Sequence, residues 1–215
     1  MSLALKAAKS YLLKKTPNVS EAINKIEEAI TASDQVSAWG GFALDRVRRD
    51  KRNVYKGNIS GVIIKTIKDL QTAFEAIGIE VDDSEIDAKI ESTFYKIDVE
   101  SVILNLMTNA YTACRQVDQN RKVKIVLKRE VVNKQGGYSL VVSDSGPGVH
   151  EKLRSIIWEP TFTTKTVEKG AAEEGTGMGL AIINGIVEEM NGLRKVDTDS
   201  TLGGARFEIW LPVIL

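Results

Sequence analysis

The spacing of hydrophobic residues in the first 55 positions predicts a hairpin of two α-helices. The first helix is expected over residues 2–15, and the second begins near Ser20, a residue type favoured at helix N-termini, after a break at Pro17. In each helix the apolar positions are three or four residues apart, which places them on one face. These positions are Leu5, Ala8 and Leu12 in the first helix and Ile23, Ile26 and Ile30 in the second. A narrow stripe of this kind is typical of a helix that packs against a partner helix.

From about residue 58 the pattern predicts a mixture of helices and short strands. An irregular stretch of about thirty residues before the last helix is too long for an ordinary connection and is therefore expected to be functional. The mixture of helices with antiparallel-type strands indicates an α+β sandwich. The predicted elements are a helix carrying Ile63, Ile67, Leu70 and Phe74; strands at 78–81 and 86–90 around a turn at 82–84; a helix over 98–115; a strand over 122–128, a turn at Gly136-Gly137 and a returning strand over 138–143; a helix over 178–190; and a strand carrying Phe207, Ile209 and Leu211.

Composition and charge exclude several classes of protein. Hydrophobic residues make up 43% of the 215 residues and charged residues 27%, which fits a folded globular chain and not a disordered one. Basic and acidic residues number 29 each, so no net field attracts nucleic acid or an anionic membrane. The basic run at 45–52 contains aspartates and no aromatic residue, which favours the solvated end of a helix over a patch that binds nucleic acid.

The single cysteine and the apolar runs point to a cytoplasmic location. Cys114 cannot form a disulfide within the chain, which favours a reducing compartment. No apolar run reaches the roughly 18 residues that a membrane-spanning helix needs, so we expect no membrane segment in this chain.

Asn105 and Asn109 are the first candidate site residues. They lie four positions apart in the predicted helix over 98–115, so both amides project from one face. An amide carbonyl is a neutral oxygen ligand that Mg²⁺ accepts while water and phosphate oxygens supply most of its coordination. The alternative, which this motif alone leaves open, is a pair of ordinary surface side chains.

Asp144 ends an apolar strand and is followed by the turn sequence Ser145-Gly146-Pro147-Gly148. These residue types favour turns whatever their function, so a plain turn is one interpretation. The functional interpretation uses the Asp144 carboxylate as an acceptor for the exocyclic amine of adenine. Guanine has an oxygen acceptor at the equivalent position and would be repelled.

A glycine-rich segment, Gly175-Thr176-Gly177-Met178-Gly179-Leu180, opens the predicted helix over 178–190. Backbone N–H groups at such a helix start can bind a phosphate. The segment has neither the spacing of a dinucleotide fingerprint nor the Gly-Lys-Ser/Thr of a P-loop. Upstream, Thr164 and Lys165 follow Phe162; Lys165 is a candidate for a point charge near terminal phosphates, and Phe162 for the anchor of a mobile lid.

In this order, the four segments resemble the N, G1, F and G2 boxes of the GHKL ATPase superfamily, over roughly residues 58–215. The amino-acid sequence around Asn109, Lys165 and Gly177 is similar to that of sensor histidine kinases of the nitrogen-regulatory type. Residues 1–55 resemble part of the dimerisation hairpin of these kinases. The resemblance implies a Bergerat-type two-layer α/β sandwich, with helices on one face of a mixed sheet, preceded by an N-terminal helical hairpin. It also implies that the chain is a homodimer through its N-terminal helices and passes a phosphoryl group to a response regulator receiver domain.

The resemblance also assigns roles around ATP and Mg²⁺. Asn109 and Asn105 are expected near the metal, Lys165 near the γ-phosphate and Asp144 on adenine. The other residues expected to bind the nucleotide are Gly146, Gly148, Thr164, Thr176, Gly177, Gly179 and Leu180. Asn105 stands where hydrolysing members carry a glutamate that activates water, and an amide is a poor base, so fast hydrolysis is disfavoured.

The chain departs from the histidine kinases in one major respect. Its single histidine, His150, follows the G1 box and is expected on the surface of the lid, which is the wrong place for a phospho-acceptor. We therefore expect a fragment that begins shortly after the acceptor motif; the alternative is a natural protein that lacks it. Two other functions stay open: a nucleotide-gated binding module or slow ATPase, and a hydrolase coupled to nucleic acid, which the zero net charge and Asn105 disfavour.

Overall fold

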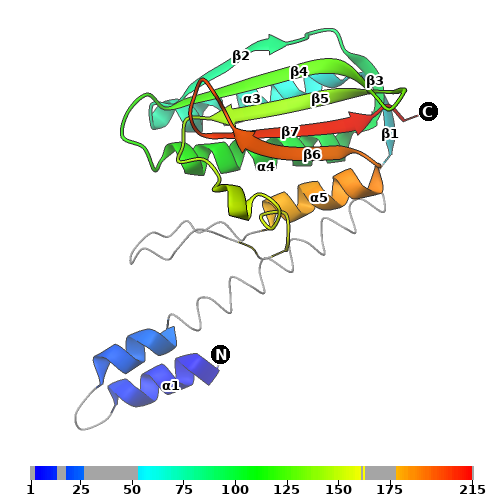
Figure 1. Ribbon diagram of the computed structural model, residues 1–215. Helices are drawn as coiled ribbons and strands as arrows, with labels where there is room; N and C mark the ends of the chain where they lie inside the picture. The colour runs from blue at the N-terminus through cyan, green and yellow to red at the C-terminus, as the bar shows by residue number, and fades with distance from the viewer. Residues whose placement is uncertain (1–2, 14–17, 27–52, 161, 163–177, 215) are drawn as a thin grey trace.

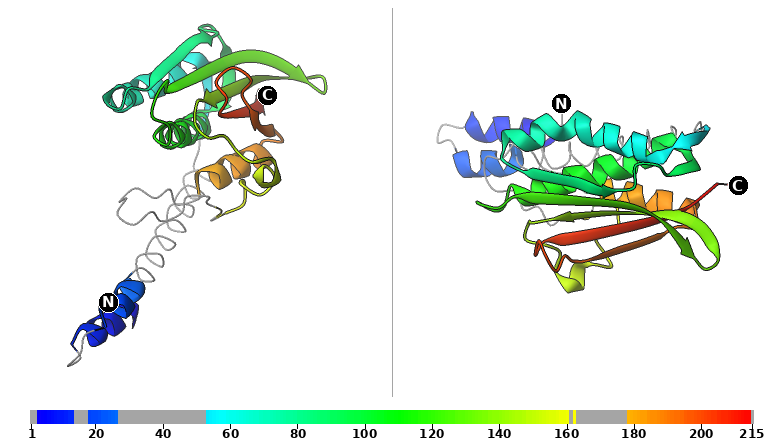
Figure 2. Two further views of the ribbon diagram at one scale, coloured as in Figure 1. Left: turned by 60° about the vertical axis from the view of Figure 1, so that its left-hand side comes forward. Right: turned by 90° about the horizontal axis from the view of Figure 1, so that it is seen from above.

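The computed structural model describes residues 3–13, 18–26, 53–160, 162 and 178–214 (Figure 1). At the N-terminus, helix α1 (Leu3–Leu12) and the helical residues 19–26 lie side by side (Figures 1 and 2). Ala8 and Ala22 are both buried, as small residues are where two helices approach closely. The second helix starts slightly earlier than predicted, because Asn18 and not Ser20 caps it: Asn18 Oδ1 accepts a hydrogen bond from the Glu21 N–H (3.0 Å). The predicted continuation with Ile30 and the basic run at 45–52 lie outside the described residues.

A five-stranded mixed sheet and a layer of three helices form the rest of the fold. The helices cover one face of the sheet (Figures 1 and 2), which confirms the predicted α+β class. The strand order is β2-β4-β5-β7-β6, in which only the β2–β4 pair is parallel. The strands are β2 (Glu80–Ile86), β4 (Lys122–Val132), β5 (Gln135–Asp144), β6 (Leu193–Thr198) and β7 (Ala205–Pro212), and the helices are α3 (Ile59–Ala76), α4 (Lys96–Cys114) and α5 (Gly179–Glu189).

The smaller elements connect these layers. Strands β1 (Val54–Asn58) and β3 (Glu91–Tyr95) form a separate antiparallel pair, and a 3-10 turn, η1 (Glu151–Leu153), follows β5. The hydrophobic pattern of the sequence did not predict β1, β3 or β6. Asn58 caps α3, since its Oδ1 accepts from the Gly61 N–H and its Nδ2 donates to the Ala88 carbonyl (3.0 Å). Among the described residues, no helix is both long and apolar enough to cross a membrane.

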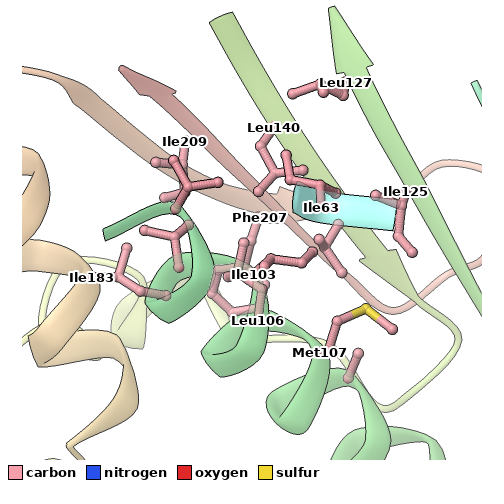
Figure 3. Close-up of a cluster of buried hydrophobic side chains, with 14 of the residues drawn as sticks. Ile63, Ile103, Leu106, Met107, Ile125, Leu127, Leu140, Ile183, Phe207 and Ile209 are labelled. Atoms are coloured by element: carbon pink, nitrogen blue, oxygen red, sulfur yellow. The ribbon is translucent and has the colours of Figure 1, made fainter. Parts of the chain in front are cut away.

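The core lies between the sheet and the helices (Figure 3). Alternate residues of the strands point toward the helices, as the period of two in a strand requires. Each fully buried aliphatic side chain stabilises the fold by about 1.5–3 kcal/mol. Of the apolar positions predicted for α3, Ile63, Ile67 and Phe74 are buried and Leu70 only partly. Core residues from the sheet are Ile125, Leu127, Leu140, Phe207 and Ile209, and those from the helices are Ile63, Ile103, Leu106, Met107 and Ile183.

The prediction of two strands around a turn at 82–84 is wrong. Strand β2 runs continuously through these residues, with a register shift relative to β4 between Asp82 and Glu85. The side chain of Asp82 accepts hydrogen bonds from both the N–H (3.0 Å) and the hydroxyl (2.5 Å) of Ser84. These residues therefore form a bulge, for which turn-type residues are also suited. The parallel partner β4, distant in the sequence, holds the strand in place.

The turn between β4 and β5 is also misplaced in the prediction. It is formed by Asn133 and Lys134, whose φ angles of 50° and 65° are those of a tight two-residue hairpin turn. Gly136 and Gly137 belong to β5. A Cβ on Gly137 would lie 2.6 Å from the Trp210 indole, so that glycine is required by packing across the sheet.

Candidate functional site

One face of α4 carries the two candidate asparagines, and it contacts a different element at each end. Asn105, Asn109 and Ala113 are four residues apart and so lie in one row. At one end of the row, a Cβ on Gly179 of α5 would lie 2.7 Å from Asn105 Oδ1. At the other end, a Cβ on Gly146 would lie 2.6 Å from the Cβ of Ala113. Two glycines thus allow the start of α5 and the turn after β5 to approach α4 closely.

Asn109 lies between these two contacts, about 6 Å along the helix axis from each, at 1.5 Å per residue. Its Nδ2 atom is buried and has no hydrogen-bond partner among the described residues. Asn105 differs, since its Nδ2 donates to the Ser101 carbonyl (2.8 Å). A buried N–H group without a partner is costly, and an acceptor oxygen of a ligand within reach of it would remove that cost.

Asp144 ends β5 and is almost fully buried, at 2% exposure. Its Oδ1 accepts hydrogen bonds from the backbone N–H groups of Gly146 (2.8 Å) and Ala205 (3.3 Å). Burial raises the pKa of the carboxyl to about 6, with a further contribution from the charge of Asp199, while the two N–H groups oppose the rise. Both of these bonds use Oδ1, so Oδ2 is the oxygen with which the carboxylate can accept from a ligand.

Gly204 is a site residue that the sequence analysis missed. A Cβ there would lie 2.3 Å from the Asp144 carbonyl oxygen and 2.5 Å from its Oδ1, so only glycine fits against the carboxylate. Gly148 has a φ of 75° and also lies close to Gly204, whose carbonyl carbon would be 3.5 Å from a Cβ on Gly148. The signal available in the sequence was the doublet Gly203-Gly204 directly before the last strand.

Some of the remaining predicted residues lie in the described part of the chain and others lie outside it. Leu180 is half-buried in the first turn of α5, and Gly146 and Gly148 belong to the turn after Asp144. His150 is exposed, as predicted, and its Nδ1 accepts from the Lys152 N–H (3.3 Å) at the start of η1. The predicted site residues that lie outside the described residues are Thr164, Lys165, Thr176 and Gly177.

The segment between Val149 and Pro160 is fixed to β6 around Trp158. The Trp158 indole is buried, its Nε1 donates to the Arg154 carbonyl (3.0 Å), and the Arg194 guanidinium lies 4.8 Å from the ring centroid. Arg154 in turn pairs with Asp197 (3.1 Å) and donates to Thr198 Oγ1 (2.9 Å) on β6. Phe162, predicted as an anchor, is half-buried against the core.

Three kinds of polar group lie along or beside the row of residues on α4. The Asp144 carboxylate accepts a hydrogen bond, the Asn109 amide supplies both an N–H donor and a carbonyl ligand, and the start of α5 presents backbone N–H groups. A purine with an exocyclic amine and a phosphate chain matches these groups. The described residues contain no group of three His, Cys, Asp or Glu side chains able to hold a metal.

Comparison with known proteins assigns this geometry to a family. The family model described as "Histidine kinase-, DNA gyrase B-, and HSP90-like ATPase" matches residues 95–214, which is more than half of the 215 residues. This range contains α4, Asp144, α5 and Gly204.

Two proteins with sequences similar to this chain are sensor histidine kinases. ZraS of Escherichia coli O157:H7 is 36% identical over 113 residues, which cover 52% of this chain and 21% of ZraS. GlnK of Bacillus subtilis is 27% identical over 187 residues, which cover 79% of this chain and 42% of GlnK. The chain therefore spans less than half the length of either relative.

Solved structures share the fold. The nucleotide-free catalytic domain of histidine kinase ThkA superposes with a TM-score of 0.59 at 24% identity, over 75% of this chain and 98% of that domain. Full-length ShkA in complex with AMPPNP gives a TM-score of 0.64 at 19% identity, over 98% of this chain and 42% of ShkA. The predicted Bergerat-type sandwich is thereby confirmed.

Proposed function

This chain belongs to the family of histidine kinase-, DNA gyrase B- and HSP90-like ATPases, and from that premise we propose that it is the catalytic, ATP-binding domain of a two-component sensor histidine kinase. The observation that carries the proposal is the buried Nδ2 atom of Asn109, which has no hydrogen-bond partner among the described residues; Asn109 lies in one row with the contacts to α5 and to the turn after Asp144. The kinase assignment is favoured because the named relatives over this range are sensor histidine kinases.

In this proposal each predicted residue has a defined part in holding ATP. Asp144 Oδ2 accepts from the adenine amine, which its ionised state at neutral pH permits. The carbonyl of Asn109, with that of Asn105, faces Mg²⁺, while Asn109 Nδ2 donates to a phosphate oxygen. Backbone groups at the start of α5 contact the phosphates, and the residues assigned to the phosphates are Thr164, Lys165, Thr176, Gly177, Gly179 and Leu180, with Gly146 and Gly148 beside the base.

The proposed reaction transfers the γ-phosphoryl group to a histidine that is not in this chain, for relay to a response regulator. His150 is not assigned as the acceptor, because it lies in the segment after Asp144 and not on the first hairpin helix, where the resemblance places the acceptor. Asn105 cannot act as a general base toward water, because an amide does not accept a proton at neutral pH. Catalysis then depends on positioning and on neutralisation of charge, the features that dominate phosphoryl transfer.

The N-terminal helices are proposed to form the homodimer, with the domain in the cytoplasm. Supporting this, five apolar side chains of the described helical segments are exposed by 36–74%, which is unusual for a surface without a partner. These side chains are Leu12, Leu13, Val19, Ile23 and Ile26.

The test uses ATP labelled at the γ-phosphate. The chain is mixed with a helical bundle that carries the histidine motif of this kinase family, and acid-labile label on the bundle and free phosphate are both followed. Label on the bundle with little free phosphate is the expected result. Free phosphate without label would instead indicate a hydrolase, and bound nucleotide with neither product would indicate a nucleotide-gated binding module. The Asp144→Asn variant is the control for transfer that depends on this site.

A further inference from the structure

The turn between β6 and β7 is closed by the side chain of Asp199. Asp199 Oδ1 accepts hydrogen bonds from the backbone N–H groups of Thr201 and Leu202, both at 2.8 Å. Two backbone bonds complete the turn: Asp199 N–H to the Gly204 carbonyl and Gly203 N–H to the Asp199 carbonyl, both at 2.9 Å. The Asp199 carboxylate thus supplies two of the four hydrogen bonds that hold residues 199–204.

This turn rests directly on Asp144. Gly204, its last residue, has no room for a Cβ against the Asp144 carbonyl, and the next residue, Ala205, donates its N–H to Asp144 Oδ1. On β5, the side chain of Ser143, the residue before Asp144, hydrogen-bonds Asp199. Asp199 is thus connected to Asp144 from two sides, through the turn and through the preceding residue of β5.

We propose that Asp199 is a positioning residue for base recognition, which holds Gly204 and Ala205 in place on Asp144 and also acts on that carboxylate through its negative charge. The inference rests on the proposed function, because it assumes that Asp144 accepts a hydrogen bond from the nucleotide base. Asp199 itself does not touch the nucleotide in this proposal.

The charges around the two carboxylates support the second part of the proposal. Burial alone would raise the pKa of Asp199, but hydrogen bonds from Leu202, Ser143 and Thr201, together with Arg206, outweigh it and leave that pKa lowered. Asp199 is therefore ionised across the range in which Asp144, with a pKa of about 6, titrates, and its charge contributes to that raised value.

The other titratable groups facing the pair are few. Arg206 on β7 faces Asp199, and the charge of Asp199 also acts on Lys124 of β4. On α4, burial raises the pKa of the Cys114 thiol, and the charge of Asp144 adds to the rise. Neither the thiol, with its raised pKa, nor the lysine changes charge between pH 5 and 7.5, so Asp144 is the group of this set that titrates in that range.

Two substitutions separate the two actions of Asp199. Asp199→Asn keeps the side-chain oxygen that accepts from Thr201 and Leu202 but removes the charge. Asp199→Ala removes both. Asp87→Asn is the matched control: Asp87 Oδ1 likewise accepts from a backbone N–H two residues on, that of Lys89 (3.1 Å), but this residue follows the far end of β2. Binding of a non-hydrolysable ATP analogue with Mg²⁺ is measured by calorimetry from pH 5 to 7.5, with each variant compared with the unchanged chain at the same pH so that titration of the ligand cancels.

At pH 7.5 we expect the affinity of Asp199→Asn for the ATP analogue to lie within about threefold of that of the unchanged chain. The pH below which this affinity falls should be lower by about half a unit in the variant. Asp199→Ala should bind about tenfold more weakly at every pH, as the loss of an orienting hydrogen-bond set implies. Asp87→Asn should match the unchanged chain. Circular dichroism of each variant without nucleotide checks folding, and recovery of affinity in the Asn variant relative to Ala distinguishes positioning from a general loss of structure.

The proposal is overturned if both Asp199 variants give the profile of the unchanged chain. An Asp144→Asn arm separates this from a failure of the proposed function. If Asp144→Asn loses binding while the Asp199 variants do not, only the role of Asp199 is wrong. If Asp144→Asn binds normally, the base-recognition site is wrong, and the inference falls with it.

Discussion

Asn105 of α4 and Gly179 of α5 are in direct contact, and the contact requires the glycine. A Cβ on Gly179 would lie 2.7 Å from Asn105 Oδ1, closer than side-chain atoms normally pack. The same asparagine is held on its other side by the hydrogen bond to the Ser101 carbonyl. The start of α5 is therefore placed against the asparagine row of α4 by the absence of one side chain.

Gly179→Ala should weaken nucleotide binding much more than it destabilises the domain. The added methyl group displaces the Asn105 amide and breaks its bond to Ser101, at a cost of about 1 kcal/mol that the higher helix propensity of alanine partly offsets. We expect a change in unfolding free energy below about 1 kcal/mol, and at least tenfold weaker binding of Mg²⁺·ATP. Denaturant unfolding and calorimetry measure the two effects.

Gly136→Ala is the control for that experiment, because a Cβ there would meet nothing within 4 Å and its backbone needs no positive φ. It should change neither quantity. Unaltered ATP binding in Gly179→Ala would show that the Asn105–Gly179 contact has no part in holding the nucleotide.

Asp144→Asn should abolish the preference for adenine while the fold persists. The asparagine Oδ1 can still accept from Gly146 and Ala205, but an NH₂ group replaces Oδ2 and meets the adenine amine donor to donor. We expect ATP affinity to fall by about 100-fold, in keeping with the 1–3 kcal/mol of an unpaired buried group, and the ratio of ATP to GTP affinity to approach one. Calorimetry with both nucleotides gives this ratio; an undiminished ATP affinity would contradict the assignment.

The same carboxyl should give the nucleotide-free domain a pH-dependent stability of known sign. Because its folded pKa, about 6, lies above the ordinary value, Asp144 stabilises the fold at low pH, and this contribution is lost as the pH rises through 6. Between pH 4 and 7 the free energy of unfolding of the unchanged chain should therefore fall by about 2–3 kcal/mol relative to that of Asp144→Asn. Unfolding in urea at several pH values measures the difference in unfolding free energy between the two chains, and the contributions of the other carboxyl groups cancel in it. A difference that stays constant across this pH range would contradict the prediction.

Asn109→Leu should separate stability from binding. Replacing the buried Nδ2, which has no partner among the described residues, by an apolar group of similar size removes a desolvation penalty. We expect the melting temperature without nucleotide to stay the same or to rise, and the affinity for Mg²⁺·ATP to fall at least tenfold. A clear loss of stability without nucleotide would mean that the amide is satisfied within the protein. Thermal unfolding with and without Mg²⁺·ATP provides both readings.

The limits of prediction differ between the elements and the site. The period of 3.6 residues located α3, α4 and α5 because each buries one wide apolar face. The edge strand β6 was missed, since exposed Leu193 and Lys195 give no clear alternation. Strand β2 was divided in two because turn-type residues also form its bulge.

Local sequence by itself determined the helices, the strand that ends at Asp144 and the identity of the polar groups in the candidate site, because side-chain periodicity and residue chemistry act over a few positions. Only the tertiary structure decided which of those groups meet. Gly204 and Ala205 reach Asp144 from about sixty residues away because β7 pairs with β5, and Gly179 reaches Asn105 because α5 packs on α4. The burial that raises the pKa of Asp144 and isolates the Asn109 amide follows from the same long-range packing, which no short stretch of the chain specifies.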